Sequence, residues 1–392
     1  MIRLPLLTFR AFSTLLFAAV YAFVPSGSFA QSASSSISLP TDLRIQSSAW
    51  WPRKAEAPRD AYVGSAACAK CHSDRAESQA NTAMAHASSL VADSESLHAH
   101  PTLTFKLGDY SYELHSDANQ SALSVTKAGE TRSHDLQWAV GQGHMGQTFL
   151  YEQGGSFYES HLSFYSELQG LDITPGHERT TPATLDDALG LKQPATEIQR
   201  CFSCHATASK TGNEFNPSHA MAGVTCESCH GPGATHIAAV NSQHGTGDMA
   251  NPAFLPPVDA VDFCGACHRT WQDVVGSGLT GVGVFNVRFA PYRLENSKCW
   301  QKTQSSLLTC VACHDPHKPL VHDLASYDSR CLQCHALSAH AAKRVANKRR
   351  ACPVSTKDCV TCHMPKVRPP NLHSDFTDHW IRIVKRGAPY PD

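Results

Sequence analysis

The chain has 392 residues, of which 42% are hydrophobic and 17% are charged, and its formal net charge is −1 at pH 7. This near-neutral balance gives no general attraction to nucleic acid or to an anionic membrane surface. The 16 cysteines and 23 histidines are too many for a cytosolic enzyme without a special use, and the histidine excess indicates that this use is metal binding.

The first thirty residues have the pattern of a signal peptide. Arg3 and Arg10 supply positive charge, residues 11–23 form a short apolar run, and the small residues Ser28 and Ala30 mark a cleavage site. An uncleaved anchor is the alternative, but the apolar run is shorter than the roughly 20 residues that a membrane span needs. We therefore expect export to the periplasm or the cell exterior, without stable membrane insertion. Residues 31–60, Ser-rich and then rich in Pro and charge, are expected to form a linker or arm.

Seven Cys-x-x-Cys-His motifs follow, and we number them in chain order. They are Cys68-Cys71-His72, Cys201-Cys204-His205, Cys226-Cys229-His230, Cys264-Cys267-His268, Cys310-Cys313-His314, Cys331-Cys334-His335 and Cys359-Cys362-His363. Two thiols at this spacing reach the two vinyl groups on one haem edge, and the histidine that follows lies under the iron as the proximal ligand. Zinc sites and disulfides do not require a histidine directly after every second cysteine. The sequence therefore predicts seven covalent c-type haems.

Seven of the 23 histidines are proximal, so enough remain to close the distal side of every iron. Bis-His ligation saturates the iron and suits an electron carrier. The expected distal ligands are His236 and His317, which closely follow a motif, and then His340, His86, His373 and His379. Weaker candidates, for which a surface or core histidine is an equal alternative, are His219, His322, His161, His144 and His177. Met84 is a rival to His86 and would raise that haem's potential.

The stretch between motifs one and two differs from the rest of the chain. Residues 61–100 carry motif one, and residues 101–195 contain short aromatic and β-branched runs broken by Gly, Asp or Asn, such as LTFKL, YSYEL, ALSVT and TFLYE. These runs predict a small antiparallel sheet, with irregular coil as the alternative.

Residues 196–392 carry the other six motifs, spaced too closely for a conventional core. The flat apolar faces of the haems are expected to take the place of apolar side chains there. The expected fold is therefore mainly α or irregular, with a haem-packed core and a small β insertion between haems one and two. Arg293, Arg330, Arg349, Arg350 and Arg382 are candidates to pair with haem propionates, or plain surface arginines.

Two cysteines lie outside the motifs, Cys299 and Cys352. In an oxidising compartment such a pair indicates a disulfide. It would close a loop of about 53 residues. By restricting the unfolded chain, such a disulfide would stabilise the fold by on the order of 4 kcal/mol. Two buried thiols are the alternative.

Several segments resemble the large bacterial multihaem cytochrome c family, which includes the tetrahaem electron carrier of ammonia oxidisers. They are VGSAACAKCH, CFSCHAT, GVTCESCHGPGATH, FCGACHR and CVACHDPH, and the C-terminal CVTCHMPK with FTDHWIRIV is similar to a heptahaem-type subgroup. The resemblance covers about residues 60–390, and GVTCESCHGPG is its most specific part. It implies electron transfer in the periplasm, and it implies that His236 is a distal ligand to another haem. The chain lacks the Cys-x-x-Cys-Lys motif of nitrite reductases within the family.

Three functions follow from these patterns. We expect an electron carrier rather than an enzyme, passing electrons between a quinol-oxidising membrane complex and a terminal reductase or the outer surface. An oxidoreductase with one five-coordinate haem, acting on a nitrogen or sulfur compound, is the first alternative, with His177 and Glu178, or Asp378 and His379, as acid–base groups. A subunit of an extracellular cytochrome filament is the second.

Overall fold

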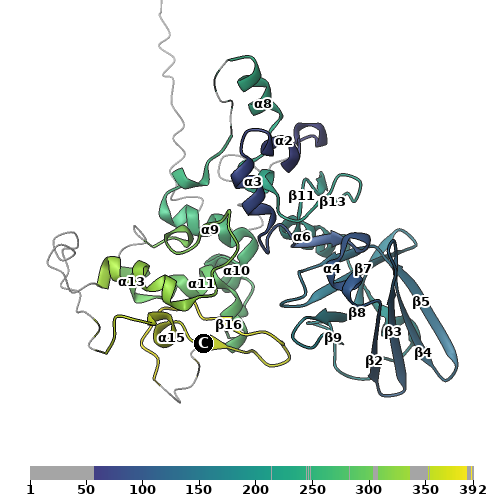
Figure 1. Cartoon of the computed structure of the whole chain (residues 1–392). Coiled ribbons are helices and arrows are strands. Elements are labelled where there is room, and N and C mark those ends of the chain that lie inside the picture. The colour runs from purple at the N-terminus through teal and green to yellow at the C-terminus, as the bar shows by residue number, and fades with distance from the viewer. Residues whose placement is uncertain are drawn as a thin grey trace, which may run out of the picture. The chain divides into compact units, whose positions relative to one another are not determined.

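The computed structural model of the chain describes residues 57–385, except 213, 244, 246, 248, 282, 303–307, 336–351 and 353, and also residue 390 (Figure 1). The expected signal peptide, most of the expected arm, and His340 lie outside the described residues. Among the described helices, none has the length and the apolar character needed to cross a bilayer.

The chain from residue 88 to residue 192 forms two antiparallel sheets. Its elements are β1 (Ser88–Leu90), η3 (Val91–Asp93), α4 (Glu95–Ala99), β2 (Thr102–Leu107), β3 (Tyr110–Ser116), β4 (Ser121–Lys127), β5 (Glu130–Leu136), β6 (Trp138–Val140), β7 (Gln147–Gln153), β8 (Ser156–Tyr165), β9 (Gly170–Ile173), α5 (Leu185–Leu189) and β10 (Gly190–Lys192). One sheet is the meander β2-β3-β4-β5. The other has the order β1-β6-β7-β8-β10, with β9 also paired to β8.

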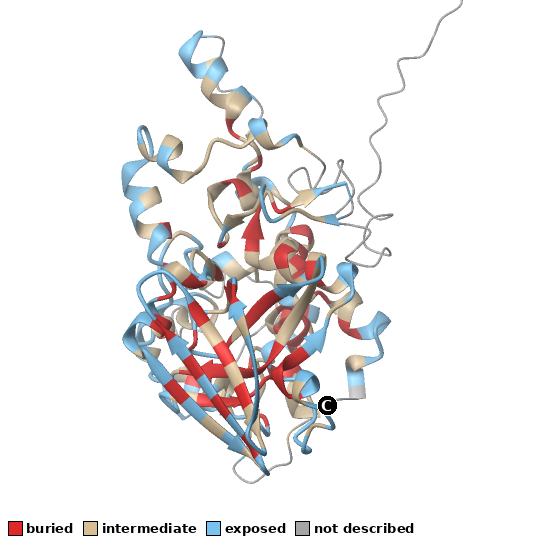
Figure 2. Ribbon diagram, turned by 90° about the vertical axis from the view of Figure 1, so that its right-hand side faces the viewer, coloured by how far each residue is buried: buried red, intermediate tan, exposed pale blue. Residues whose placement is uncertain are grey.

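The two sheets share one apolar core. Along β3 buried and exposed residues alternate strictly, as a strand with one solvated face requires. Tyr112 and Leu114 of the four-stranded sheet belong to the same buried cluster as Phe149 and Leu162 of the six-stranded sheet. Figure 2 shows the buried residues as red bands across the strands. This β region therefore holds itself together with its own side chains.

Short helices carry the motifs in the rest of the chain. The elements are η2 (Arg59–Ala61), α2 (Ser65–Ala69) and α3 (Ser73–Ala80) before the sheets, and after them α6 (Ala195–His205), α7 (Cys226–His230), α8 (Ala234–Asn241), η4 (Pro252–Phe254), α9 (Pro257–His268), α10 (Trp271–Gly276), η5 (Leu279–Gly281), η6 (Gly283–Arg288), α11 (Ala290–Glu295), α12 (Lys298–Lys302), η7 (Cys310–Ala312), η8 (Leu324–Tyr327), α13 (Asp328–His335) and α15 (Cys359–His363). Three two-stranded ribbons accompany them: β11 (Ala206–Thr207) with β14 (Met221–Ala222), β12 (Lys210–Thr211) with β13 (Glu214–Phe215), and β15 (Lys366–Val367) with β16 (Phe376–Thr377).

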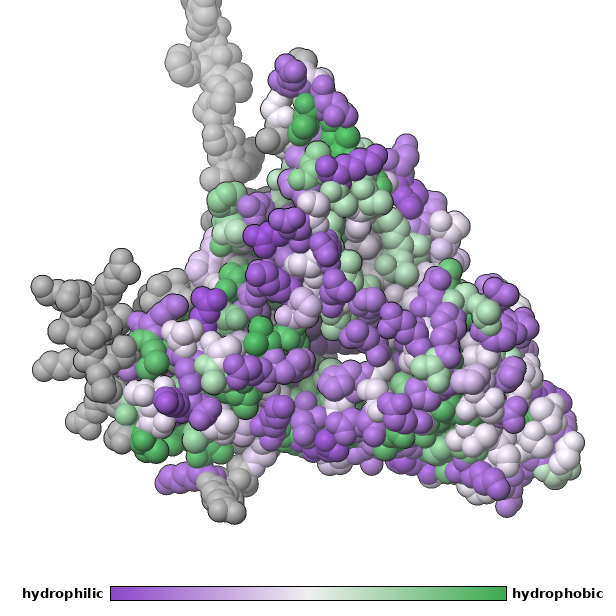
Figure 3. Space-filling model, viewed as in Figure 1, coloured by the Kyte–Doolittle hydropathy of each residue, from purple (hydrophilic) through white to green (hydrophobic). Residues whose placement is uncertain are grey.

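Side-chain cores are small in this helical part. Within the described residues, Val261, Leu294 and Trp300 form one buried apolar cluster, and Val274, Phe289 and Tyr292 form another. The face in Figure 3 shows hydrophobic residues exposed among hydrophilic ones over this part of the chain. Val311, inside motif five, is 56% exposed.

The mainly α fold class predicted from the sequence is wrong. Ten strands lie between residues 88 and 192 alone, and further ribbons follow motifs two and seven. The expectation failed because it treated the strands as a small insertion in a mainly α or irregular chain. The alternating apolar strands instead supply enough side chains for a core of their own. The strands do lie where the aromatic and β-branched runs predict them.

Candidate haem-binding sites

Each motif occupies about one helical turn. Helices α6, α7, α9, α13 and α15 all end at the proximal histidine of their motif. In motif one, the backbone N–H groups of Cys71 and His72 both donate to the carbonyl of Cys68, and motif five repeats this arrangement. Residues three and four apart lie on one face of a helix. This turn therefore presents both thiols and the proximal imidazole on the same side.

Backbone carbonyls hold several proximal histidines from behind. Nδ1 of His205 donates to the Ala87 carbonyl, Nδ1 of His230 to that of Ala250, and Nδ1 of His363 to that of Arg382, each at 2.9 Å. A proton kept on Nδ1 leaves Nε2 unprotonated and free to bind a metal. These hydrogen bonds are the outer contacts that metal-binding histidines typically make.

Three proximal histidines face a second imidazole. The ring centroids of His72 and His236 are 6.4 Å apart, those of His230 and His317 are 5.9 Å apart, and those of His314 and His379 are 6.2 Å apart. A metal about 2 Å from each Nε2 separates two imidazole centroids by roughly 6 Å. The three pairs therefore have the spacing of two axial ligands of one iron, and the residues fit a c-type haem.

Burial keeps several of these imidazoles neutral. It lowers the pKa of His314 and His317 below the ordinary value, and it lowers the pKa of His379 to about 4. It also lowers the pKa of His268, the proximal residue of motif four. Neutral imidazole is the form that binds a metal. The environment therefore favours the ligating form without help from a metal.

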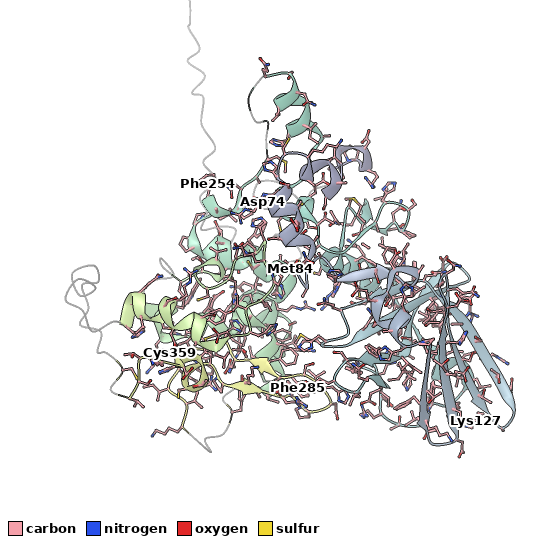
Figure 4. All side chains as sticks on the ribbon, in the orientation of Figure 1. Asp74, Met84, Lys127, Phe254, Phe285 and Cys359 are labelled. Carbon is pink, nitrogen blue, oxygen red and sulfur yellow. The ribbon has the colours of Figure 1, made fainter. Side chains whose placement is uncertain are left out.

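The motifs meet one another in a definite order. Helix α2 of motif one contacts α7 of motif three, and α9 of motif four contacts both α6 of motif two and η7 of motif five. Helix α13 of motif six contacts α15 of motif seven. Cys359, at the start of α15, is labelled in Figure 4.

Thiols of different motifs lie together at these contacts. Cys68 and Cys226 are hydrogen-bonded neighbours, as are Cys264 and Cys310. Burial raises the pKa of Cys68 to about 11, and the neighbouring Cys226 thiol contributes to the increase. Because these thiols are the predicted haem attachment points, the contacts bring the predicted attachment points of different motifs together.

Three of the expected distal ligands, His236, His317 and His379, are thus brought opposite proximal histidines. Two others are placed differently. Nε2 of His373 donates to Oδ2 of Asp172 at 2.8 Å, and His86 is exposed in the turn between α3 and β1, two residues after Met84 (Figure 4). The ligand roles of His86 and His373 remain predictions.

The weaker candidates make other contacts. His161 and His177 contact each other inside the β region, with 3.2 Å between their Nδ1 atoms. His219 is hydrogen-bonded to Thr211, and His144 and His322 are exposed. None of these five is seen stacked against a proximal imidazole in the described part of the chain.

The burial of two carboxylates, those of Asp378 and Glu227, was not predicted from the sequence. Asp378 is fully buried and accepts hydrogen bonds from Arg293, which was expected near a propionate or on the surface. Burial alone would raise the pKa of Asp378, but the hydrogen bonds from Arg293 hold it below its usual range. Glu227, between the two cysteines of motif three, is also fully buried. Its place inside the GVTCESCHGPG segment was the available signal.

The leftover cysteines are Cys299 on α12 and Cys352, which is exposed. Cys299 lies close enough to Cys313 and Cys331 to act on the pKa of both thiols. The connecting residues 336–351 lie outside the described part of the chain, so the disulfide remains a prediction.

Parts of this chain are similar to known proteins. The family model described as "Cytochrome c554 and c-prime" matches residues 171–231, which contain motifs two and three. The multiheme cytochrome MtrA of Shewanella baltica (strain OS185) is 26% identical over 196 residues, and the match covers 46% of this chain and 56% of that relative's length. The crystal structure of the outer cell wall cytochrome OcwA aligns with a TM-score of 0.47 at 17% identity, over 83% of this chain and 80% of that chain. The repeated Cys-x-x-Cys-His motifs and these matches make the chain similar to the bacterial multihaem cytochromes c, and they fit covalently bound c-type haem.

Proposed function

We propose that the protein is an exported electron-transfer protein with seven covalent c-type haems, one at each motif and mostly bis-His-ligated. The observation that carries this proposal is the set of three proximal histidines that each face a second imidazole at 5.9 to 6.4 Å between ring centroids. Haem supplies reversible one-electron chemistry at its iron. The chain supplies the axial ligands of the irons, buries the haems and sets the distances between them.

The three imidazole pairs support a proposed distal ligand for each of three haems. His236 closes haem one, His317 closes haem three and His379 closes haem five. In each case the distal histidine follows the motif two places further along the chain. A segment that carries one motif therefore also supplies the distal ligand for the haem of another motif. Loss of that segment would disturb both haem sites. His86, His340 and His373 remain candidates for the other haems.

The contacts between motif helices support a path for electrons. Motif three contacts motif one, motif four contacts motifs two and five, and motif six contacts motif seven. Between these groups, Cys229 acts on the pKa of Cys264, and Cys331 acts on that of Cys313. The resulting order is one, three, four, five, six and seven, with motif two as a branch at motif four. Electrons entering at either end can cross the chain in short steps.

We further propose that the protein works in the periplasm or outside the cell. The signal-peptide pattern of residues 1–30 supports this location. A quinol-oxidising membrane complex is the proposed electron donor, and a terminal reductase or outer-surface protein is the proposed acceptor. Covalent haems add propionate charge to a chain of net charge −1, so the holoprotein is acidic and its partners should present basic surfaces.

Haem stoichiometry and ligation test the proposal together. The intact mass of the purified protein should exceed that of the processed chain by seven haems. Ferrous spectra with and without carbon monoxide report open irons. Replacing His236, His317 or His379 with Ala should each add one carbon monoxide-binding haem relative to the wild type, whereas the same change at the exposed His115 should add none. Fewer than seven haems, or no new binding in all three variants, would refute the proposal.

A protein with strong carbon monoxide binding before any substitution would instead favour an oxidoreductase with an open haem. Comparing the intact mass with and without reductant tests the proposed Cys299–Cys352 disulfide separately. Labelling of both thiols in the native protein would exclude that disulfide.

A further inference from the structure

Glu227 is a carboxylate buried between two haem motifs. It is the second residue of motif three, on α7, and its exposed fraction is 0%. Its Oε1 accepts from the backbone N–H groups of Val63 at 2.9 Å and Gly233 at 2.8 Å, and its Oε2 accepts from that of Gly64 at 2.8 Å. Hydrogen bonds to a charged acceptor are about twice as strong as neutral ones.

The three donors flank the two axial ligands assigned to haem one. Val63 and Gly64 directly precede α2, which leads into His72. Gly233 directly precedes α8, which carries His236. The carboxylate therefore binds the start of the proximal segment and the start of the distal segment at once, although the two are more than 160 positions apart.

The backbone at Gly233 lies close to the side chains of Val63 and Glu227. A Cβ atom at Gly233 would lie 2.8 Å from Cγ2 of Val63 and 3.3 Å from Oε1 of Glu227. Only glycine fits there without displacing its neighbours. The thiol of Cys226, one residue before Glu227, lies 3.6 Å from the hydroxyl of Ser65 on α2. Motif three is thus packed directly against the segment that binds haem one.

We propose that Glu227 is a positioning residue for haem one, and that its carboxylate holds His236 opposite His72. This inference rests on the proposed function, because it takes His236 as the distal ligand. The side chain does not touch the iron ligands themselves. It acts through the backbone of Val63, Gly64 and Gly233, whose positions fix where the two imidazoles stand.

The variant E227Q tests this role. A carboxamide has one oxygen, so at least one of the three backbone N–H groups must then face an NH₂ donor. We expect one additional high-spin haem per chain that binds carbon monoxide. Added imidazole should return that haem to low spin, because a free ligand can occupy the position that His236 has left. The matched control is E197Q, at a half-exposed glutamate on α6 that forms a surface ion pair with Arg200.

A second variant covers the case in which E227Q does not assemble. G233A adds one methyl group at the tight approach and should give the same additional carbon monoxide-binding haem. Its control is G276A, where nothing lies within 4 Å of the added Cβ. If G233A and E227Q both retain the wild-type spectrum, the positioning role is refuted.

The double variant E227Q/H236A separates this inference from the proposed function. If both changes act on haem one, the double variant binds no more carbon monoxide than H236A alone. Two additional open haems would show that Glu227 acts elsewhere and would overturn the inference. If H236A itself opens no haem, the ligand assignment of the proposed function fails. If H236A opens one and E227Q opens none, only the role of Glu227 fails.

Discussion

Nε2 of His373 donates a hydrogen bond to Oδ2 of Asp172 at 2.8 Å, across 201 positions of the chain. Asp172 lies on β9 of the six-stranded sheet, and His373 lies between β15 and β16, after motif seven. Arg179 also donates to Asp172, and the hydroxyl of Ser374 donates to the carbonyl of His144. The C-terminal ribbon is therefore fastened to the β region by polar contacts.

The first prediction concerns this fastening. D172N and H373F should increase hydrogen exchange and proteolytic cleavage across residues 366–377, because each removes the charged hydrogen bond that ties the ribbon to β9. The haem spectrum of D172N should not change. The control is E167Q, which removes the exposed ion pair between Glu167 and Arg368. It should have little effect, because exposed ion pairs contribute little to stability. A new high-spin haem in H373F would instead establish His373 as an axial ligand.

The second prediction compares a buried ion pair with an exposed one. Arg293 and Asp378 are both 0% exposed and lie 2.8 Å apart, whereas Arg368 and Asp375 are about half exposed and lie 2.9 Å apart. D378N should lower the free energy of unfolding by about 3–5 kcal/mol, because it leaves a buried guanidinium without its counter-charge.

D375N is the matched control and should cost at most about 1 kcal/mol. Denaturant titration of the holoprotein, followed by the fluorescence of tryptophans, measures both. Equal effects of D378N and D375N would contradict the assigned importance of burial.

The third prediction concerns a glycine beside motif three. Gly223 has φ +74°, and a Cβ there would lie 1.8 Å from the Ala85 carbonyl oxygen, in the turn that follows Met84. G223A should therefore displace the segment that leads into α7 and reduce haem incorporation at motif three. Gly129 has a similar φ of +86° but open space around it, so G129A should show only the backbone cost of about 1–2 kcal/mol. Haem content per chain measures the difference, and equal haem content in the two variants would contradict the steric argument.

The candidate haem attachment residues could be picked out from the sequence because the Cys-x-x-Cys-His spacing is local. Cys226, Cys229 and His230 lie within one turn, so no knowledge of the fold is needed to see what they bind. The strands were also predictable, since the period-two alternation of β3 is visible in YSYEL.

The distal ligands were predictable only as candidates. His379 and His373 are six positions apart in similar surroundings, yet one faces His314 and the other binds Asp172. Which of them faces a proximal histidine depends on contacts between segments distant in the chain, and periodicity carries no such information. The burial of Asp378 and Glu227 was hidden for the same reason.

The last prediction is a pH dependence that originates in the β region. His161 on β8 is 5% exposed, and its Nε2 has no hydrogen-bond partner among the described residues. Its ring stacks on Tyr112, and its Nδ1 faces His177, whose Nε2 donates to Glu159 at 3.1 Å. Burial lowers the pKa of His161 to about 4, and electrostatic repulsion from His177 contributes to the decrease.

The sign of the effect follows from proton binding. Unfolded His161 takes up a proton near its ordinary pKa of about 6.5, whereas the folded protein resists protonation until about pH 4. The unfolded state therefore binds more protons in this window, so stability is full above about pH 6.5 and falls as the pH drops to about 4. The loss is on the order of 3 kcal/mol. H161F cannot titrate and should flatten the pH dependence, whereas H115F, at an exposed position on β3, should leave it unchanged. Unfolding free energies of the two variants and the wild type at pH 7 and pH 4.5 decide the matter. A wild-type slope retained in H161F would place the titrating group elsewhere.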